Sequence, residues 1–459
     1  MLDSQIVAPS AKPSTLAELL EQTPLHSNIL LCVSGSIAAY KALELASMLK
    51  KLGAQVAVVM SQSAQRFITP LSFEAITHNK VLCEQSEEWS TMDTSVQKLD
   101  SSSSKADRPH SCNHIAYAKW ADLCILAPAT ASSIAKLAHG IADNLLTQTL
   151  LATSAPILCA PAMNTAMLES KQTQANLTTL AAMGIQIIEP KSALLACNTQ
   201  GIGALADVDE LVFALLKASK QDRFWLDREV YITGGGASAM LDPVRAITNH
   251  SSGLQASALA IALYTLGARV RLISSSFPTP LPKAIEVEQV RSNDDYKQAL
   301  LRLNKQRKKA RSKQRAILLM AAALADFAPK SKTPSKIKKS KTTQLHLALE
   351  PTQDILASLD SSDFVKVGFK AEDSLEVGLS NAKAMLLPRE NGGKDCEIVC
   401  LNTLDSSPFG ASHNAFTLLN RQSLQDSSAR TLPHSTKLAL SYEIASFIKA
   451  SLEHLESNA

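Results

Sequence analysis

The sequence reads Asp-Pro-Val-Arg-Ala-Ile-Thr-Asn-His-Ser-Ser-Gly at residues 242–253, a polar stretch between two apolar segments. Before it, residues 230–233 form an apolar run typical of a buried strand, and after it, residues 254–266 have apolar side chains at helical spacing. A further apolar run at residues 269–274 predicts a second strand. Backbone N–H groups at the start of the intervening helix favour a phosphate or a carboxylate, so the loop is predicted to hold a ligand. The candidate donors are Arg245, Asn249, His250, Ser251 and Ser252.

The same alternation of short apolar runs and helical patterns extends over most of the chain. Each run is followed by a small or polar loop, which predicts parallel sheets covered by helices. We therefore expect an α/β fold with two domains, at residues 27–220 and 221–459, joined near residues 217–228. The runs lie at residues 28–33, 55–60, 123–127 and 156–160 in the first domain, and at 230–233, 317–323, 365–369 and 397–401 in the second.

Composition places the chain among globular enzymes without a general affinity for nucleic acids or membranes. Of its 459 residues, 46% are hydrophobic and 19% are charged, and its formal net charge is only +4. The longest apolar run, residues 316–325, is about half the length that spans a bilayer. Residues 1–26 lack the features of a secretory signal and are expected to form a mobile extension. The eight cysteines show no paired spacing, so we expect reduced thiols and a cytoplasmic location.

Three segments interrupt the α/β pattern. Residues 85–112 include four consecutive serines and are expected to form a flexible insertion in the first domain. Two interpretations are open for the basic residues 305–315, a nucleic-acid patch and a solvated helix end, and the lack of interleaved aromatic residues favours the second. Residues 331–343 are also rich in lysine but follow a strand end directly, which makes them the better candidate for ligand binding.

In the first domain, two loops of small residues follow predicted strands. Residues 34–41 read Ser-Gly-Ser-Ile-Ala-Ala-Tyr-Lys and open a helix, as a phosphate-binding turn does, although they are not a G-x-G-x-x-G dinucleotide motif. Residues 127–133 form a second loop at another strand end, where open α/β sheets bind their ligands. Together the two loops could hold one mononucleotide, whereas each alone is more often a simple helix cap. Taken singly, His114, Asn164 and Cys197 would pass for a packing residue, a turn residue and a loop residue.

Longer motifs connect both halves with known families. In the first half, His114-Ile115 is followed by Trp-Ala-Asp at residues 120–122, by Pro-Ala-Thr-Ala at 128–131, by Ile-Ala-Lys-Leu-Ala-His-Gly-Ile-Ala-Asp at 134–143 and by Pro-Ala-Met-Asn-Thr-Ala-Met at 161–167. This set resembles the flavin-dependent cysteine decarboxylases. The second half, with residues 241–253, Ala-Ala-Leu-Ala-Asp at 322–326 and Lys-Ile-Lys-Lys at 336–339, resembles the phosphopantothenate-cysteine ligase half of bacterial bifunctional coenzyme A biosynthesis proteins.

For the first half, the resemblance implies a flavodoxin-like parallel-sheet domain that binds FMN and decarboxylates 4'-phosphopantothenoylcysteine to 4'-phosphopantetheine. His114 is implied as a base in the oxidative step, a role that suits an imidazole because it changes its charge near neutral pH. Asn164 is implied to hold the substrate carboxylate, and Cys197 to donate the final proton from a mobile flap. The residues implied in FMN binding are Gly35, Ser36, Ile37, Ala38, Ser61, Thr130, Ala131, Ser132, Ser133 and Met163.

For the second half, the resemblance implies a Rossmann-like α/β ligase domain that joins 4'-phosphopantothenate to cysteine through an acyl-cytidylate, using CTP and Mg²⁺. Lys336 is implied to engage the CTP phosphates and Asp326 to contact the nucleotide, while Asn249 and Arg245 hold the acyl intermediate. Any one lysine taken alone would be interpreted as a solvated side chain. The resemblance also implies a homo-oligomer, with the FMN site partly across subunit contacts. The further residues implied at the CTP site are Ala323, Lys338, Asp354, Ile355, Leu356, Phe369, Lys383 and Lys394.

Several positions depart from the family pattern. Asn198, Ala204 and Leu205 stand where the flap usually has a glycine and an Arg-Met pair. Residues 234–240 replace the usual Gly-Pro-Thr-x-Glu-Pro turn of the ligase and lack its polar donors and its carboxylate. The main hypothesis is a bifunctional enzyme. Two alternatives stay open, an enzyme in which only the decarboxylase half is active and a non-catalytic regulatory flavoprotein.

Overall fold

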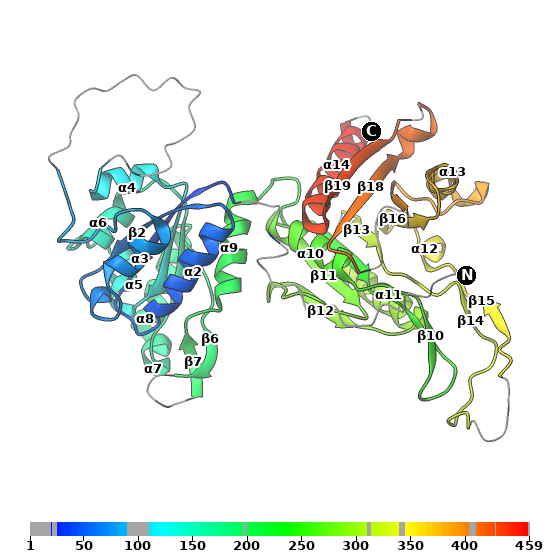
Figure 1. The fold of residues 1–459 in the computed structure, drawn as a ribbon, viewed down its shortest axis with the longest axis horizontal. Helices are drawn as coiled ribbons and strands as arrows, with labels where there is room; N and C mark the ends of the chain where they lie inside the picture. Colours follow the sequence, from blue (N-terminus) through cyan, green and yellow to red (C-terminus); the bar gives the residue numbers. More distant parts are fainter. Residues whose placement is uncertain are drawn as a thin grey trace, which may run out of the picture. The chain divides into compact units, whose positions relative to one another are not determined.

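The computed structural model describes residues 20, 25–89, 109, 111–195, 198, 200–309, 314–338, 345–403, 410–426 and 428–457. The chain divides into two compact units, one of which runs from Thr23 to Lys220 while the other contains Gln221 to Ala459 (Figure 1). Most of the expected N-terminal extension, residues 90–108 of the expected insertion, and Cys197 lie outside the described residues.

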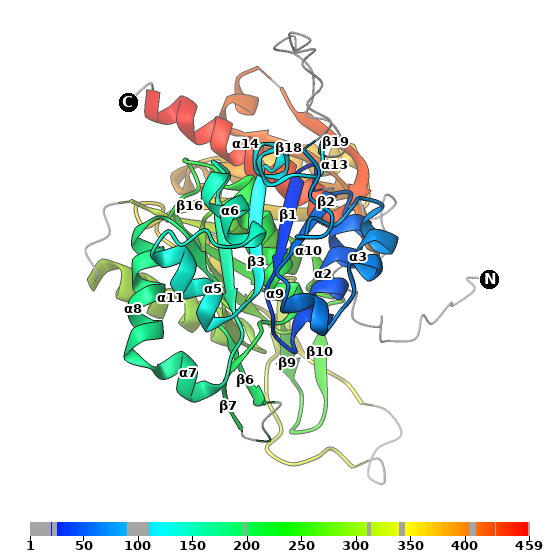
Figure 2. The same ribbon diagram turned by 90° about the vertical axis from the view of Figure 1, so that its left-hand side faces the viewer.

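The first unit is built on a five-stranded parallel sheet in the order β2-β1-β3-β4-β5. In Figure 2, β1 lies between β2 and β3. This is the strand order of flavodoxin, and it confirms the predicted fold class of this half. All side chains of β1 and β3 are buried, as expected of strands covered on both faces. The strands are β1 (Asn28–Val33), β2 (Gln55–Met60), β3 (Leu123–Ala129), β4 (Ile157–Pro161) and β5 (Gln186–Ile187).

Helices cover both faces of this sheet. On one face α2 contacts α9, and on the other α4 contacts α6, which in turn contacts α5, while α5 contacts α8 (Figure 1). An antiparallel hairpin of β6 and β7 follows β5, and β7 contacts the short helix α7. The helices are α2 (Ala39–Lys51), α3 (Pro70–Thr77), α4 (His114–Trp120), α5 (Ala131–Ala138), α6 (Leu145–Ala152), α7 (Thr165–Glu169), α8 (Lys171–Ala182) and α9 (Val208–Lys220), and the hairpin strands are β6 (Lys191–Leu194) and β7 (Gln200–Ala204).

The second unit contains an eight-stranded sheet in the order β12-β11-β8-β13-β16-β17-β18-β19. Its first six strands are parallel and follow the 3-2-1-4-5-6 order of the Rossmann fold, which confirms the predicted class of this half. The last two strands are antiparallel. The strands are β8 (Glu229–Gly234), β11 (Arg269–Ser274), β12 (Glu286–Gln289), β13 (Ala316–Met320), β16 (Phe364–Glu372), β17 (Ile398–Thr403), β18 (His413–Asn420) and β19 (Arg430–Thr436).

Two apolar cores lie on opposite faces of this sheet. One contains buried side chains of α10 and α14, and the other contains those of α11, α12 and α13. Figure 1 shows α10 and α14 on one side of the strands and α13 on the other. The helices are α10 (Leu254–Thr265), α11 (Asn293–Lys309), α12 (Ile355–Ser358), α13 (Leu375–Leu386) and α14 (Lys437–Ser457).

Two short hairpins extend the second unit beyond what the sequence predicts. The polar stretch at residues 242–253, expected as one loop, begins instead as the turn between β9 (Ser238–Met240) and β10 (Ala246–Thr248). A second hairpin joins β14 (Phe327–Pro329) to β15 (Leu349–Pro351). Both hairpins have mostly exposed or half-exposed side chains, so they show no apolar pattern in the sequence.

Three further features singled out in the sequence have the following surroundings within the described part of the chain. The cysteines at positions 32, 124, 159 and 400 are fully buried free thiols. In the basic segment 305–315, Lys308 Nζ on α11 lies 2.7 Å from Asp363 Oδ1, and Arg315 Nη1, directly before β13, lies 3.5 Å from Glu397 Oε1. None of the helices in the described ranges is long and apolar enough to cross a membrane.

Candidate functional site

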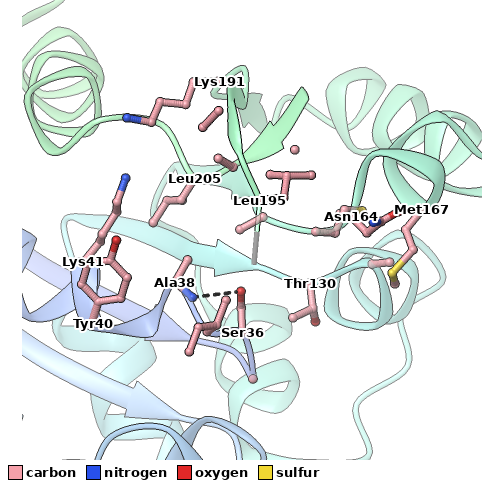
Figure 3. A pocket seen from close by; sticks show the side chains of 18 of the residues that line it. Ser36, Ala38, Tyr40, Lys41, Thr130, Asn164, Met167, Lys191, Leu195 and Leu205 are labelled. Carbon is pink, nitrogen blue, oxygen red and sulfur yellow. Dashed lines mark hydrogen bonds between the residues drawn. The ribbon is translucent and has the colours of Figure 1, made fainter. Parts of the chain in front are cut away.

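The first unit has a cavity of about 590 Å³ where the strand order reverses, between β1 and β3. Open α/β sheets bind ligands at this switch point, outside the carboxyl ends of the strands. In Figure 3, Asn164 and Met167 lie at one end of the pocket, Lys41 and Lys191 at the other, and Ser36 between them. Seven of the ten residues implied in FMN binding line the cavity, namely Gly35, Ser36, Ile37, Ala38, Thr130, Ala131 and Met163.

Ser34 ties the two pocket loops together. Its hydroxyl donates to the carbonyl of Pro128 at 2.7 Å and accepts from the amide of Thr130 at 3.0 Å. Thr130 then caps α5, since its hydroxyl accepts from the amide of Ser133 at 3.3 Å. The first turns of α2 and α5 are thereby held beside one another at the ends of β1 and β3.

This donor set fits a flavin mononucleotide. The N-terminal turns of two helices offer backbone N–H groups to a phosphate, while the exposed apolar side chains of Ile37, Met167 and Leu194 offer a surface to a ring system. The other residues implied in FMN binding have different surroundings. Ser133 takes part in the cap of α5, and the hydroxyls of Ser61 and Ser63 are hydrogen-bonded to each other at 3.2 Å. Ser61, Ser132 and Ser133 do not line the cavity.

Two lysines that sequence reasoning left without a role lie at one end of this pocket. Burial lowers the pKa of Lys41, and the nearby ammonium of Lys191 lowers it further. Lys191 forms an ion pair with Asp207. Lys41 ends the quoted 34–41 loop and Lys191 opens β6, so the fold brings together two positive charges that are distant in the sequence.

Asn164 lies where the pocket meets the β6–β7 hairpin. It caps α7, with its side-chain oxygen accepting from the amide of Ala166 at 2.9 Å. The hairpin docks on the same loop, because the amide of Met163 donates to the carbonyl of Gly203 at 2.9 Å. Gly203 has φ +147°, and a Cβ at this position would lie 2.2 Å from the Met163 carbonyl oxygen. The hairpin turn that includes Cys197 therefore starts from strands fixed beside Asn164, although Cys197 itself lies outside the described residues.

His114 lies outside this cavity, so the structure does not bring it together with Asn164 within one chain. It begins α4, and its Nδ1 is 2.9 Å from Glu87 Oε1. The ring of Trp89 meets the imidazole edge-on, with ring centroids 5.4 Å apart. Sequence reasoning missed Glu87 because it falls in the segment expected to be a flexible insertion. The described part of that segment is anchored, since the amide of Glu88 donates to the carbonyl of Cys112 at 2.8 Å.

The second unit has a cavity of about 530 Å³ at its own switch point, between β8 and β13. Asn249 and Asp326 line it from the loops after these strands, and Phe369 lines it from β16. Phe369 packs edge-on against Phe416 with ring centroids 5.9 Å apart, which gives the cavity an aromatic wall. The predicted residues on this wall are Asn249, His250, Ser251, Ser252, Ala323, Asp326 and Phe369.

The altered turn at residues 234–240 holds Asn249 in place. The Asn249 side chain donates to the carbonyl of Leu324 at 2.7 Å. A Cβ at Gly236 would lie 2.2 Å from the Asn249 carbonyl oxygen, so only glycine admits this approach. The turn also bonds the loop after β13 through Ala237 N to Ala323 O, at 2.9 Å. The turn therefore positions the loop through backbone contacts.

Arg245 and Lys336 lie apart from this cavity. Asp242, whose side chain is fully buried, accepts from Arg245 Nη1 at 2.8 Å and from the amide of Ile337 at 3.0 Å. Hydrogen bonds from backbone amides, first that of Ile337, lower the pKa of the Asp242 carboxyl to about 2. Asp242 thus fixes the segment whose side chains Lys336 and Lys338 are exposed. The structure does not bring Arg245 or the two lysines together with Asn249 on the cavity wall.

Of the remaining predicted nucleotide residues, Lys394 alone lines a further, smaller cavity of about 250 Å³. Its side chain forms an ion pair with Asp354, Nζ to Oδ2 2.8 Å. Asp354 caps α12, where Ile355 and Leu356 are buried. Lys370 lines both cavities, which places them next to one another. Lys383, on α13, lines neither.

One lysine that sequence reasoning missed lines the larger cavity. Lys437 is the first residue of α14 and is only 7% exposed. Burial lowers its pKa to about 8. Its neighbours on the cavity wall include Asn402 and Asn414, also missed. The sequence around Lys437 reads Ser-Thr-Lys-Leu and carries no motif that marks it as a ligand contact.

The two units match two protein-family models. Residues 18–219 match the family described as Flavoprotein, and residues 225–452 match the DNA/pantothenate metabolism flavoprotein C-terminal domain. The fold and the cavities thus belong to a two-domain flavoprotein class with a Rossmann-like second half.

Similarity to curated proteins extends over both halves. The chain is 35% identical over 439 residues to the coenzyme A biosynthesis bifunctional protein CoaBC of Vibrio vulnificus, covering 94% of this chain and 100% of that protein. It is 36% identical over 432 residues to the Bacillus subtilis protein of the same name, covering 93% and 97%, and 34% identical over 398 residues to that of Escherichia coli, covering 85% and 90%. The chain therefore belongs to the CoaBC family of bifunctional coenzyme A biosynthesis proteins, which confirms the family predicted from the motifs.

Proposed function

We propose that this protein is a bifunctional enzyme of coenzyme A biosynthesis that uses its two switch-point cavities for two successive reactions. The second unit would join 4'-phosphopantothenate to cysteine with CTP, and the first would decarboxylate the resulting 4'-phosphopantothenoylcysteine to 4'-phosphopantetheine. The observation that carries the proposal is that each cavity is lined by residues that the family resemblance implies for its reaction.

In the first unit, Gly35 to Ala38 and the first turn of α5 would bind the FMN phosphate. When bound, FMN supplies a reversible two-electron oxidation, which gives the carbanion left by loss of carbon dioxide a neighbouring electron sink. Asn164, at the cavity edge, would hold the substrate carboxylate, and His114 would accept a proton in the oxidative step. Cys197 would return a proton in the final reduction.

In the second unit, the residues would stabilise charge on phosphates and on the acyl intermediate. Asn249 is fixed by its bond to Leu324 and would orient the acyl-cytidylate, while the aromatic wall around Phe369 suits a nucleotide base. Nucleotidyl transfer depends mainly on charge neutralisation, for which Lys336 and Lys338 are exposed and available. Within the described ranges no group of three or more His, Cys, Asp or Glu side chains could hold a metal, so we assign Mg²⁺ mainly to the CTP phosphates.

The two activities can be separated by single substitutions. Purified protein would be given 4'-phosphopantothenate, cysteine and CTP, with pyrophosphate and carbon dioxide followed independently. Lys336→Gln should stop pyrophosphate release while carbon dioxide still forms from supplied 4'-phosphopantothenoylcysteine, and Asn164→Asp should do the reverse. Lys332→Gln, an exposed lysine on the same segment, is the matched control and should leave both activities unchanged.

The outcomes also separate the competing functions. Carbon dioxide release without any ligation by wild type would leave only the decarboxylase half active. Bound flavin with neither product would support a regulatory flavoprotein instead. Loss of both activities in a folded single variant would contradict the assignment of separate sites.

We also propose that the first unit assembles as a homo-oligomer that completes its site. His114 is not among the residues that line the cavity beside Asn164, and Leu194, on the cavity wall, is 67% exposed. Coexpressing His114→Asn and Asn164→Asp chains with different tags, and purifying the mixed assembly, tests this directly. Restored decarboxylation in the mixed assembly supports a site shared between copies, whereas its absence in a mixed oligomer contradicts it.

A further inference from the structure

Lys437 forms no ion pair with any acidic residue that the structure describes. The residue is more than nine-tenths buried, and it lines the cavity between β8 and β13. Burial is the single cause that shifts its pKa, and no acidic group offsets this effect. Among the described residues its side-chain amine has no hydrogen-bond partner. Burying an unpaired cation is unfavourable, so such a group is usually matched by an anion that binds beside it.

The surroundings of Lys437 also favour an anion. Lys437 opens α14, and residues 251–254 at the start of α10 line the same cavity. The two helices meet near their first turns, where Gln255 Nε2 donates to Ser441 Oγ at 3.1 Å. Two helix N-termini, each with a partial positive charge, therefore lie at one cavity. At α14 the amides of Lys437 and Ala439 already donate to the Ser412 carbonyl and the Thr436 hydroxyl, so Lys437 offers its side chain there. Asn402 and Asn414 add neutral donors to the wall.

A close backbone approach shapes the α10 end of this site. Gly253 has φ +76°, and a Cβ there would lie 2.6 Å from Ser276 Oγ and 2.8 Å from the Ser276 carbonyl oxygen. Ser276 Oγ in turn donates to the carbonyl of Ser252 at 2.9 Å. The first turn of α10 is thereby fixed before any ligand binds, which lowers the entropy lost on binding.

We propose that the Lys437 side chain, with the first turn of α10, binds a phosphoryl group of a ligase substrate. The inference rests on the ligase function proposed above and adds a contact to it. Two sources carry this chemistry, the triphosphate of CTP and the phosphate of 4'-phosphopantothenate. The exposed Lys336 lies off the cavity wall, so Lys437 would be the buried cation of the site.

Isothermal titration calorimetry on the full-length protein tests the proposal, with CTP and 4'-phosphopantothenate titrated separately. Lys437→Met removes the charge and keeps the length of the side chain. Losing one charge-assisted hydrogen bond should raise the Kd of one ligand about 10- to 100-fold. The ligand that weakens identifies the source of the phosphoryl group. Lys449→Met, on the same helix but paired with Asp222 away from the cavity, is the matched control and should bind both ligands as wild type does.

The outcomes separate this inference from the function on which it rests. If wild type and Lys437→Met bind both ligands with Kd values within twofold, Lys437 holds no phosphoryl group, while the ligase function stands. If wild type binds neither ligand, both proposals fail. Decarboxylation of supplied 4'-phosphopantothenoylcysteine and a single cooperative melt of the second unit show that the variant is folded.

Discussion

Replacing Lys437 by methionine should make the unliganded second unit more stable. Burial shifts the pKa of this lysine from 10.5 to about 8. Near pH 7 the folded state therefore carries a charge that costs about 3 kcal/mol relative to the unfolded chain, since each tenfold change in a protonation equilibrium is worth about 1.4 kcal/mol. Methionine fills the same space without the charge. For a domain of this size, such a gain should raise the melting temperature by roughly 6–12 °C.

The stability gained by Lys437→Met should depend on pH, because it comes from a group that titrates. A base whose pKa is lowered on folding binds fewer protons in the folded state than in the unfolded state between pH 8 and 10.5. The destabilisation is fully present below pH 8 and is relieved as the pH rises through this window. Wild type should therefore gain stability there relative to Lys437→Met, so that the advantage of the variant falls to about 1 kcal/mol at pH 10.

Scanning calorimetry at pH 7 and pH 10, without nucleotide, measures both effects. Release of bound flavin marks the transition of the first unit, so the remaining transition reports the second. Lys449→Met is again the control, and loss of its partly exposed ion pair with Asp222 should change stability by less than about 1 kcal/mol. The reasoning is refuted if Lys437→Met melts at or below wild type at pH 7, or if its advantage is as large at pH 10.

Two further substitutions test the decarboxylase half. Gly203→Ala places a Cβ 2.2 Å from the Met163 carbonyl oxygen, so it should displace the loop that contains Asn164. Carbon dioxide release should fall at least tenfold, while pyrophosphate release is unchanged. Equal loss of both activities would point to misfolding. Glu87→Gln removes the carboxylate 2.9 Å from His114 Nδ1, and it should lower the kcat of decarboxylation about tenfold with little change in KM, as measured by steady-state kinetics. A rise in KM alone would show that Glu87 does not act through His114.

The fold could be predicted largely because its central strands are buried on both faces. Residues 28–33 and 55–60 were expected as strands and form β1 and β2 with the same bounds. Such strands are continuous apolar runs that stand out from their polar loops. The edge strand β19 was not predicted, because most of its side chains are exposed and its sequence, Arg-Thr-Leu-Pro-His-Ser-Thr, alternates poorly.

The candidate site was predictable only where it follows a motif. Asn249 and Asp326 came from such motifs, and both line the cavity of the second unit. Lys437 and Glu87 belong to no motif, and their place in a site depends on contacts with residues distant in the sequence. Lys437 reaches a cavity formed mostly by residues more than a hundred positions earlier, and Glu87 meets a histidine across a segment without regular apolar spacing. A single polar residue forms no pattern in the sequence, so its surroundings can be identified only from the folded structure.

The turn at residues 234–240 contributes to the cavity of the second unit through its backbone, although its side chains are small. Its sequence lacks the polar donors and the carboxylate that the family usually has there. In the structure, however, its glycines admit the Asn249 loop and its backbone bonds Ala323, so the turn contributes shape through the main chain. Asn402 of β17, Asn414 of β18 and Lys437 line the same cavity with polar side chains. On this view small residues at the turn are compatible with ligation, because the turn positions Asn249 and the loop after β13 through the main chain and needs no side chain for it.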